Sequence, residues 1–260
     1  MREVEIVKID VSNRTANKVK DYVAEEKPLN IFLNKAYYAT IFCSPSNLKE
    51  LALGHLLSEG ILESFEEIEE VKLKNEACYV KIKSNIDVEK RLKLSKHFSR
   101  VITSACGGSS AYQYSGKLPK IKSNLKVKAE TILNSVKNLN FIAETFRKTG
   151  GVHAAAIYKK DGELVAFAED VGRHNAVDKA IGMAALNKTD FSACFLALSG
   201  RLTNDMVLKA GRVGLPIVAS LAAALDSGIA IAKDISLTLI GFVRGNRMNI
   251  YACSERILLN

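Results

Sequence analysis

Four short apolar runs in the second half of the chain do most to limit its possible folds. They cover residues 153–158, 194–199, 216–220 and 236–243, and most of them lack the apolar–polar alternation of a half-exposed strand. Patterns typical of helices lie between them. Because strands that are buried on both faces read as continuous apolar runs, this order predicts an α/β fold in which helices cover both sides of a sheet.

The segments around these runs predict where helices and turns lie. A long amphipathic helix is expected to end at two glycines, residues 150–151. Its apolar face comprises Ile132, Val136, Leu139, Ala143 and Phe146. A hairpin is expected to turn at Asp161–Gly162. Further helices are expected from Asn175 to about residue 186, after Thr203 and near residues 227–233, and residues 244–247 join the last two strands.

The first half of the chain predicts short strands and one clear helix. Asn47 is expected to cap that helix and Gly60 to stop it, and His55 lies on its apolar side as a half-buried packing residue. Residues 69–83 alternate like the two strands of a hairpin, with Cys78 on the buried face. Since the pattern changes near residue 128, we expect a fold that is α+β overall. It has a smaller N-terminal α+β domain over residues 1–128 and an α/β domain over residues 129–260.

Charge and cysteine content narrow the class of protein. The 260 residues include 37 Lys and Arg against 28 Asp and Glu, and the resulting net charge of +9 favours anionic partners. Aromatic residues are not interleaved with the basic ones, so no nucleic-acid partner is expected. The sequence has neither a signal-peptide core nor an apolar run of 18 residues, which predicts a cytoplasmic protein with no membrane contact. Five widely spaced cysteines argue against a disulfide framework.

The order of elements from residue 131 resembles that of the zinc-dependent nucleoside deaminases. Those enzymes need His-x-Glu and Pro-Cys-x-x-Cys to hold zinc and move protons. Here Ala154 and Ala155 follow His153, and no Pro-Cys-x-x-Cys occurs. The resemblance implies a deaminase-like, three-layer mixed sheet. Because the zinc-binding residues are missing, we expect neither the deaminase chemistry nor a metal site. The sequence also lacks a Gly-x-Ser-x-Gly elbow, a phosphate loop and a dinucleotide fingerprint.

Glycine and arginine occur together at the ends of three predicted strands, in residues 169–175, 199–201 and 242–247. In an open α/β sheet, ligands bind beyond the carboxyl ends of the strands. Glycine lets a ligand approach the backbone, and arginine binds phosphate or carboxylate at two points. We therefore expect an anionic, nucleotide-like ligand. The residues that would hold it are Arg173, His174, Gly200, Arg201, Arg244, Gly245, Asn246 and Arg247.

Two alternatives stay open at this predicted edge. The arginines could instead form surface salt bridges with Asp170, Asp205 or other carboxylates, contributing little. His153 and His174 could bind a substrate or move a proton, whereas a structural role is equally open for His153.

Residues 101–116, VITSACGGSSAYQYSG, place a single cysteine, Cys106, in a run of small and polar residues with no periodic apolar face. Two glycines follow it and make such a loop accessible. The loop either presents a reactive thiol or merely contains one. Thiolate is the reactive form and flanking cations favour it; those cations are Lys96, Arg100, Lys117 and Lys120. The other four cysteines lie in apolar or strand contexts and are expected to be small core residues.

Five segments together resemble one family in their order and spacing. They read LALGHLLSEGIL (51–62), TGGVHAAA (149–156), EDVGRHNAVDKAIG (169–182), SGRLTNDMVLKA (199–210) and GFVRGNRMNIYA (241–252). On these residues the chain is identified as a member of the formate dehydrogenase accessory sulfurtransferases, the FdhD family. The match covers most of the chain, and it implies a deaminase-like second domain and a homodimer.

The resemblance also implies an activity. Members of this family take sulfur from a cysteine desulfurase as a persulfide. They deliver it to the molybdenum or tungsten bis(molybdopterin guanine dinucleotide) cofactor of the catalytic subunit of formate dehydrogenase. The family's sulfur carrier matches Cys106. Its segment that binds this guanine-nucleotide-containing cofactor matches Phe242, Val243, Arg244, Gly245, Asn246 and Arg247.

Two positions depart from the family pattern. The second cysteine of the family's loop is replaced by Ser109, and residues 221–226 lack an expected Ala-Pro pair. A non-catalytic chaperone that binds the molybdenum cofactor is therefore the alternative function, with Ser109 marking the loss of sulfur transfer.

Overall fold

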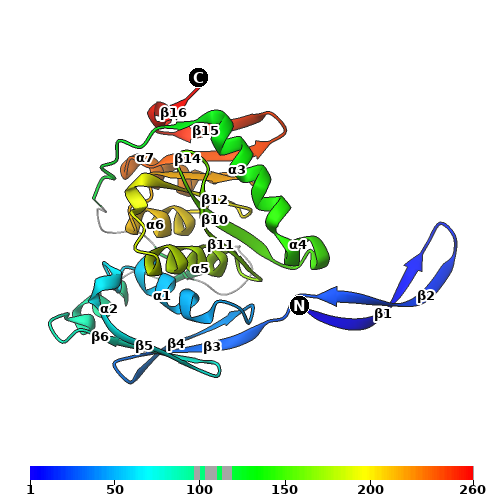
Figure 1. The fold of residues 1–260 in the computed structure, drawn as a ribbon, viewed down its shortest axis with the longest axis horizontal. Helices are drawn as coiled ribbons and strands as arrows, with labels where there is room; N and C mark the ends of the chain where they lie inside the picture. The colour runs from blue at the N-terminus through cyan, green and yellow to red at the C-terminus, as the bar shows by residue number, and fades with distance from the viewer. Residues whose placement is uncertain (97–99, 103–109, 113–118, 260) are drawn as a thin grey trace.

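The computed structural model describes residues 1–96, 100–102, 110–112 and 119–259 (Figure 1). Its centre is a six-stranded mixed sheet in the order β11-β10-β12-β13-β14-β15. The strands β12, β13 and β14 are parallel, and each outer pair is antiparallel. The bounds are β10 His153–Lys159, β11 Leu164–Asp170, β12 Cys194–Leu198, β13 Ile217–Ser220, β14 Thr238–Arg244 and β15 Arg247–Ala252.

Helices cover both faces of this sheet, which confirms the predicted α/β layers. On one face α3 (Ala129–Ile142) packs Val136 and Leu139 against alternate strand residues such as Phe195. On the other face, Val177 of α5 (Arg173–Leu186) packs with the strand residues between them, such as Leu196. The helices α6 (Asn204–Arg212) and α7 (Asp226–Asp234) join α5 in that layer. Side chains of adjacent strand residues point to opposite faces, so two apolar clusters form.

Of three predictions about helix ends, two are wrong and one is confirmed in position only. The helix expected to run through Ala143 to Gly150 breaks at Ala143, whose ψ is 79°, and a separate α4 (Glu144–Thr149) leaves Phe146 42% exposed. Helix α5 begins at Arg173, after Gly172, rather than at Asn175 as expected. Asn175 lies buried inside the helix, where its side chain donates to the Phe42 carbonyl and the Asp170 carboxylate. Asn47 occupies the predicted N-cap position of α1 (Leu48–Ser58), but it adopts a left-handed conformation and its side chain forms no capping hydrogen bond.

The N-terminal part of the chain forms a second, four-stranded sheet in the order β4-β3-β6-β5. Residues 69–83 form the predicted hairpin, and Cys78 is buried beside Val80 and Ile82. The bounds are β3 Lys27–Leu33, β4 Ala36–Cys43, β5 Ile68–Lys74 and β6 Ala77–Ile82. The remaining short elements are η1 Phe65–Glu67, α2 Val88–Lys96, β7 Arg100–Ile102, β8 Ser110–Tyr112, β9 Val127–Lys128, η2 Phe191–Ala193, η3 Ser254–Arg256 and β16 Ile257–Leu258.

Helix α1 lies between the N-terminal sheet and α5, and the two helices cross at two glycines. A Cβ atom added to Gly54 would lie 1.7 Å from the carbonyl oxygen of Asp178, and one added to Gly182 would lie 1.9 Å from that of Glu50. The backbones therefore touch directly. One apolar cluster extends from Leu29 and Leu53 to Val177 and Leu196, so both parts of the chain share a core. The domain boundary near residue 128 stays a prediction.

The first two strands leave the body as an arm, which we define as residues 1–26. β1 (Arg2–Asp10) and β2 (Thr15–Val23) pair only with each other, and Figure 1 shows the hairpin projecting away from the rest of the molecule. Near its base, the ammonium group of Lys148 in α4 lies 5.8 Å from the ring of Tyr22. No helix among the described residues is long and apolar enough to cross a membrane.

Candidate functional site

The three glycine–arginine segments lie at one edge of the six-stranded sheet, as predicted. Because β10 is antiparallel to both β11 and β12, the carboxyl ends of β11, β12, β13 and β14 share that edge. His153 begins β10 at the same edge, opposite Asp170. Residues 171–174 and 199–201 meet because Arg173 packs on Gly200, although β10 lies between their strands. The turn at 244–247 follows β14, and β13 separates β14 from β12. Strands in a sheet are about 4.8 Å apart, so this separation is roughly 10 Å.

Arg173 is the most distinctive side chain of this edge. It is only 11% exposed and lies over Gly200, where an added Cβ atom would be 3.2 Å from the Arg173 Cβ atom. Within the described part of the chain, its Nε and Nη2 atoms have no hydrogen-bond partner. A buried guanidinium with free donors is costly, and a bound anion would satisfy it. Arg173 therefore fits a ligand that carries phosphate or carboxylate groups.

His174 competes with Arg173 for the nearest carboxylate. The His174 ring Nε2 and the Asp205 Oδ2 atom share a hydrogen bond, and the Thr203 hydroxyl donates to the other oxygen of Asp205. Burial alone would raise the pKa of Asp205, but these two bonds and the nearby cations lower it well below its usual value. Arg173 Nη2 stays 3.9 Å from Asp205, beyond hydrogen-bond distance. Among the described residues, this contact is the only salt bridge between one of these arginines and a carboxylate, so the predicted alternative is met by one long contact.

His153 adds a neutral group to the same edge. Its Nδ1 atom lies 3.3 Å from the hydroxyl of Ser199, which also accepts a hydrogen bond from the Ala154 amide at 3.0 Å. Burial lowers the pKa of His153, and the positive charges of Arg173, His174 and Arg201 lower it further. Ser199 had no predicted role, although it begins the Ser-Gly-Arg segment. His153 and Ser199 line a pocket of about 460 Å³ together with Phe146, Val171 and Leu221.

The turn between the last two strands is exposed. Phe242 adopts a positive φ of 51° at a bulge in β14, Val243 is buried, and the Arg244 guanidinium lies 4.9 Å from the centre of the Phe242 ring. Arg244 and Arg247 face each other across the pair of strands. They are therefore placed to bind one anion from the solvent side. Gly245, Asn246 and Arg201 are exposed as well.

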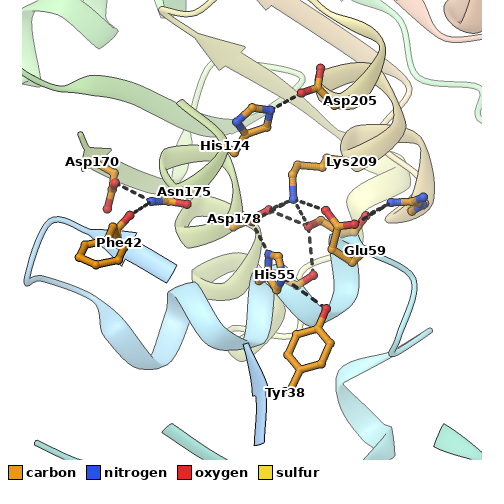
Figure 2. A network of polar contacts seen from close by, with 12 residues as sticks. Tyr38, Phe42, His55, Glu59, Asp170, His174, Asn175, Asp178, Asp205 and Lys209 are labelled. Carbon is orange, nitrogen blue, oxygen red and sulfur yellow. Dashed lines mark hydrogen bonds and ion pairs between the residues drawn. The ribbon is translucent and has the colours of Figure 1, made fainter. Parts of the chain in front are cut away.

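Many residues of the sequence motifs form a buried polar network between α1, α5 and α6 instead of a ligand site (Figure 2). The Lys209 ammonium group donates to Asp178 at 2.9 Å and to Glu59 at 2.8 Å. His55 is half-buried, as predicted. Its ring does more than pack, because its two nitrogens lie 3.2 Å from Asp178 and 3.5 Å from the Tyr38 hydroxyl.

A second buried pair lies at the start of α5. The Lys179 ammonium group lies 2.6 Å from Asp170, and neither side chain is exposed. Lys179 also donates to the Ser44 carbonyl, and Asp170 accepts from the Ser44 amide. These contacts join the end of β4 to the segment that carries Arg173. Sequence reasoning missed them, because charged residues on a helix normally face solvent.

Comparison with known proteins identifies the family. The model of the FdhD/NarQ family matches residues 24–258. The chain belongs to the FdhD/NarQ family. It is 39% identical over 255 residues to the "Sulfur carrier protein FdhD" of Saccharolobus solfataricus, with 96% of each chain covered. It is 36% identical to the protein of the same name from Methanothermobacter thermautotrophicus. That alignment covers 99% of this chain and 98% of the relative.

The fold of this chain is also similar to that of a protein solved by crystallography. A crystal structure from Desulfotalea psychrophila, described as that of a formate dehydrogenase accessory protein, matches with a TM-score of 0.79 and 26% identity. The match covers 99% of both chains. The α+β fold over both sheets is thus shared, and the fold class predicted from the sequence is confirmed.

The cysteine predicted as the carrier in this FdhD/NarQ chain, Cys106, lies outside the described residues, as does Ser109. The other four cysteines are described. Cys43, Cys78 and Cys194 are buried, which raises the pKa of each thiol to about 11, and partial burial also raises that of Cys253. The prediction that they are core residues is confirmed for the first three. Among the described residues, no three His, Cys, Asp or Glu side chains gather as metal ligands would.

Proposed function

We propose that this protein is the sulfur carrier of formate dehydrogenase maturation. Cys106 receives sulfur as a persulfide from a cysteine desulfurase, and the protein passes it to the molybdenum or tungsten bis(molybdopterin guanine dinucleotide) cofactor of the formate dehydrogenase catalytic subunit. The near full-length similarity to proteins named as sulfur carriers is the observation that carries this proposal. Homodimer formation and a cytoplasmic location belong to the same proposal.

The choice of Cys106 rests on the chemistry of the other cysteines. A thiolate attacks the outer sulfur of the desulfurase persulfide, the sulfur–sulfur bond of the donor breaks, and the donor's thiolate leaves. The transferred sulfur keeps its oxidation state. Cys43, Cys78 and Cys194 are buried thiols whose raised pKa values leave almost no thiolate at neutral pH. Cys106 stands apart in its glycine-rich sequence with cations on both sides.

The sheet edge supports the sulfur acceptor as its ligand. A bis-guanine-dinucleotide carries two pyrophosphates and needs several cationic donors. Arg173 offers free buried donors, Arg201 is exposed at the end of the next segment, and Arg244 with Arg247 forms a second cationic point beyond β13. Gly200 and His174 would border the ligand beside Arg173. Phe242 and Val243 would position the turn that contains Gly245 and Asn246.

Mass spectrometry after incubation with a desulfurase and cysteine tests the carrier. The wild-type chain should gain the mass of one sulfur atom on the peptide with Cys106, and Cys106→Ala should gain none. Cys78→Ala is the matched control. It should load sulfur normally and lose only about 1 kcal/mol of unfolding free energy, as expected for a small buried group. Sulfur loading that persists in Cys106→Ala refutes the proposal.

Ser109 favours one alternative, a chaperone that binds the cofactor but transfers no sulfur. A hydroxyl cannot take over a persulfide or form a disulfide. The same mass spectrum separates the two functions, because a chaperone would bind guanine nucleotide without gaining sulfur at Cys106.

A further inference from the structure

The arm has unpaired strands and exposed apolar side chains, as is typical of a surface that is buried in an interface. Its two strands have no partner besides each other in the described chain, and a lone two-stranded hairpin is marginally stable in water. Even so, its tip carries aliphatic side chains: Val7 is 58%, Ile9 68% and Val11 84% exposed. Val7 and Ile9 lie on one face of the hairpin, with Ala16 opposite Ile9. Such side chains together favour burial against another surface.

A complementary patch lies at the base of the arm, where α3 ends and α4 begins. Phe141 is 72% exposed, Phe146 is also exposed, and the guanidinium of Arg147 lies 5.7 Å from the centre of the Phe141 ring. We call Phe141, Phe146 and Arg147 the aromatic patch. The base of the arm lies beside α4, where Lys148 approaches Tyr22, but its tip points away from the body (Figure 1). The rings of Phe141 and Phe146 therefore stay exposed in the single chain.

The net charge of the arm also differs from that of the rest of the chain. Residues 1–26 contain five basic and six acidic residues, whereas residues 27–260 contain 32 basic and 22 acidic residues. The arm is therefore the slightly acidic part of a basic protein. Within the arm, the tip (residues 7–18) contains three basic residues and one acidic residue, whereas the base (residues 1–6 and 19–26) contains two basic and five acidic residues. The basic tip of one arm is therefore complementary in charge to the acidic base of a second arm.

We infer that the arm is the dimerisation element, and that the tip of each arm docks on the aromatic patch of a second copy of this chain. This rests on the homodimer of the proposed function. Two arms related by a two-fold axis through their midpoints run antiparallel, so the tip of each meets the base of the other. The base is where the aromatic patch lies. Strands of nine residues span about 30 Å, which is enough to reach it.

Three full-length variants test this arrangement by light scattering on a size-exclusion column. The wild type should elute with twice the chain mass of 28.4 kDa. Ile9→Asp and Phe141→Asp should each elute as monomers at the same concentration, because each places a carboxylate in both tip–patch contacts. Leu164→Asp is the control: this residue is also exposed and apolar but lies on β11, away from the arm, and the variant should stay dimeric. A far-ultraviolet circular dichroism spectrum equal to that of the wild type will show that each variant is folded.

Mixing the two monomeric variants gives the sharpest outcome. A heterodimer of Ile9→Asp with Phe141→Asp places both substitutions in one tip–patch contact and leaves the other contact intact. Dimer should therefore reappear on mixing. A monomeric wild type would refute the homodimer itself. A dimer that survives either substitution, or no recovery on mixing, would refute the arm as its element while leaving sulfur loading at Cys106 unaffected.

Discussion

Asp178 and Lys209 form an ion pair in which both side chains are almost completely buried, 2.9 Å apart, at the point where α1, α5 and α6 meet. Ser58 donates to the same carboxylate at 2.6 Å, and Glu59 takes a further bond from Lys209. Every polar group around this pair therefore has a partner. Such a cluster tolerates the loss of one member poorly, because the remaining charge stays buried.

Removing the charge of Asp178 should destabilise the fold. In Asp178→Asn, Lys209 keeps only Glu59 as a counter-ion, and we expect a loss of about 3–5 kcal/mol of unfolding free energy in urea. Asp234→Asn, an exposed substitution on α7, is the control and should change it by less than about 0.5 kcal/mol. A loss below about 1 kcal/mol for Asp178→Asn would mean that solvent screens the cluster.

The same network predicts sensitivity to acid. Burial would raise the pKa of Glu59, but the charges of Lys209, His55 and Arg212 outweigh it and lower the pKa to about 2; that of Asp178 is lowered as well. Carboxylates with lowered pKa values stabilise the fold above their unfolded values, and this contribution is lost as pH falls through the folded ones. Stability should therefore drop from about pH 4.5 towards pH 2. In Glu59→Gln the drop should be shallower, and an equal slope would contradict this origin.

The crossing of α1 and α5 should tolerate no added methyl group. Gly54→Ala would place a Cβ atom 1.7 Å from a backbone oxygen, so the helices must separate, and we expect a loss of about 3 kcal/mol or more. Gly150→Ala is the comparison: no described atom lies within 4 Å of its added Cβ atom, and only the positive φ of 62° is strained. That strain costs about 1–2 kcal/mol. Similar losses of unfolding free energy in Gly54→Ala and Gly150→Ala would mean that α1 and α5 can move apart at little cost.

His153 should report ligand binding at the sheet edge. Burial and three neighbouring positive charges lower its pKa below the ordinary value of 6.5. A bound phosphate would offset those charges and favour the protonated ring, so the pKa should rise when GDP is added. Proton NMR of the ring signals measures this, with His55 in the buried network as the internal control. A His153 titration that GDP leaves unchanged would place the anion elsewhere.

The exposed turn should contribute separately to nucleotide affinity. Arg247→Ala removes a charge-assisted hydrogen bond and should weaken GDP binding by roughly 1.5–3 kcal/mol in calorimetry, without affecting sulfur loading at Cys106. Lys160→Ala, an exposed cation in the turn between β10 and β11, is the control. Unchanged affinity in both Arg244→Ala and Arg247→Ala would remove this turn from the ligand site.

The layers of the main sheet, and the position of the three glycine–arginine segments at one end of its strands, followed from the sequence because both depend on local patterns. Apolar runs such as residues 194–198 read as buried strands, and parallel strands put their carboxyl ends on one side. The helix ends were harder. Asn175 has the right chemistry for a cap, but a carbonyl 133 positions away in the chain, that of Phe42, takes its side chain. Long-range competition of this kind leaves no local signal.

The free donors of Arg173 could not be foreseen either. Its nearest carboxylate, Asp205, was named as a salt-bridge partner, but the ring of His174 occupies that carboxylate. The projecting arm was missed for the opposite reason: its strands alternate ordinarily, and nothing in residues 1–26 tells a hairpin on the body from one that leaves it.

The direct contact of the α1 and α5 backbones at Gly54 and Gly182 also limits how such a protein can evolve. A recombination that joined the N-terminal sheet of one relative to the main sheet of another would pair helices that were never selected against each other. Small shifts in either helix would then force a collision at the glycines or separate Lys209 from Glu59. We therefore expect the two sheets to be inherited as one unit.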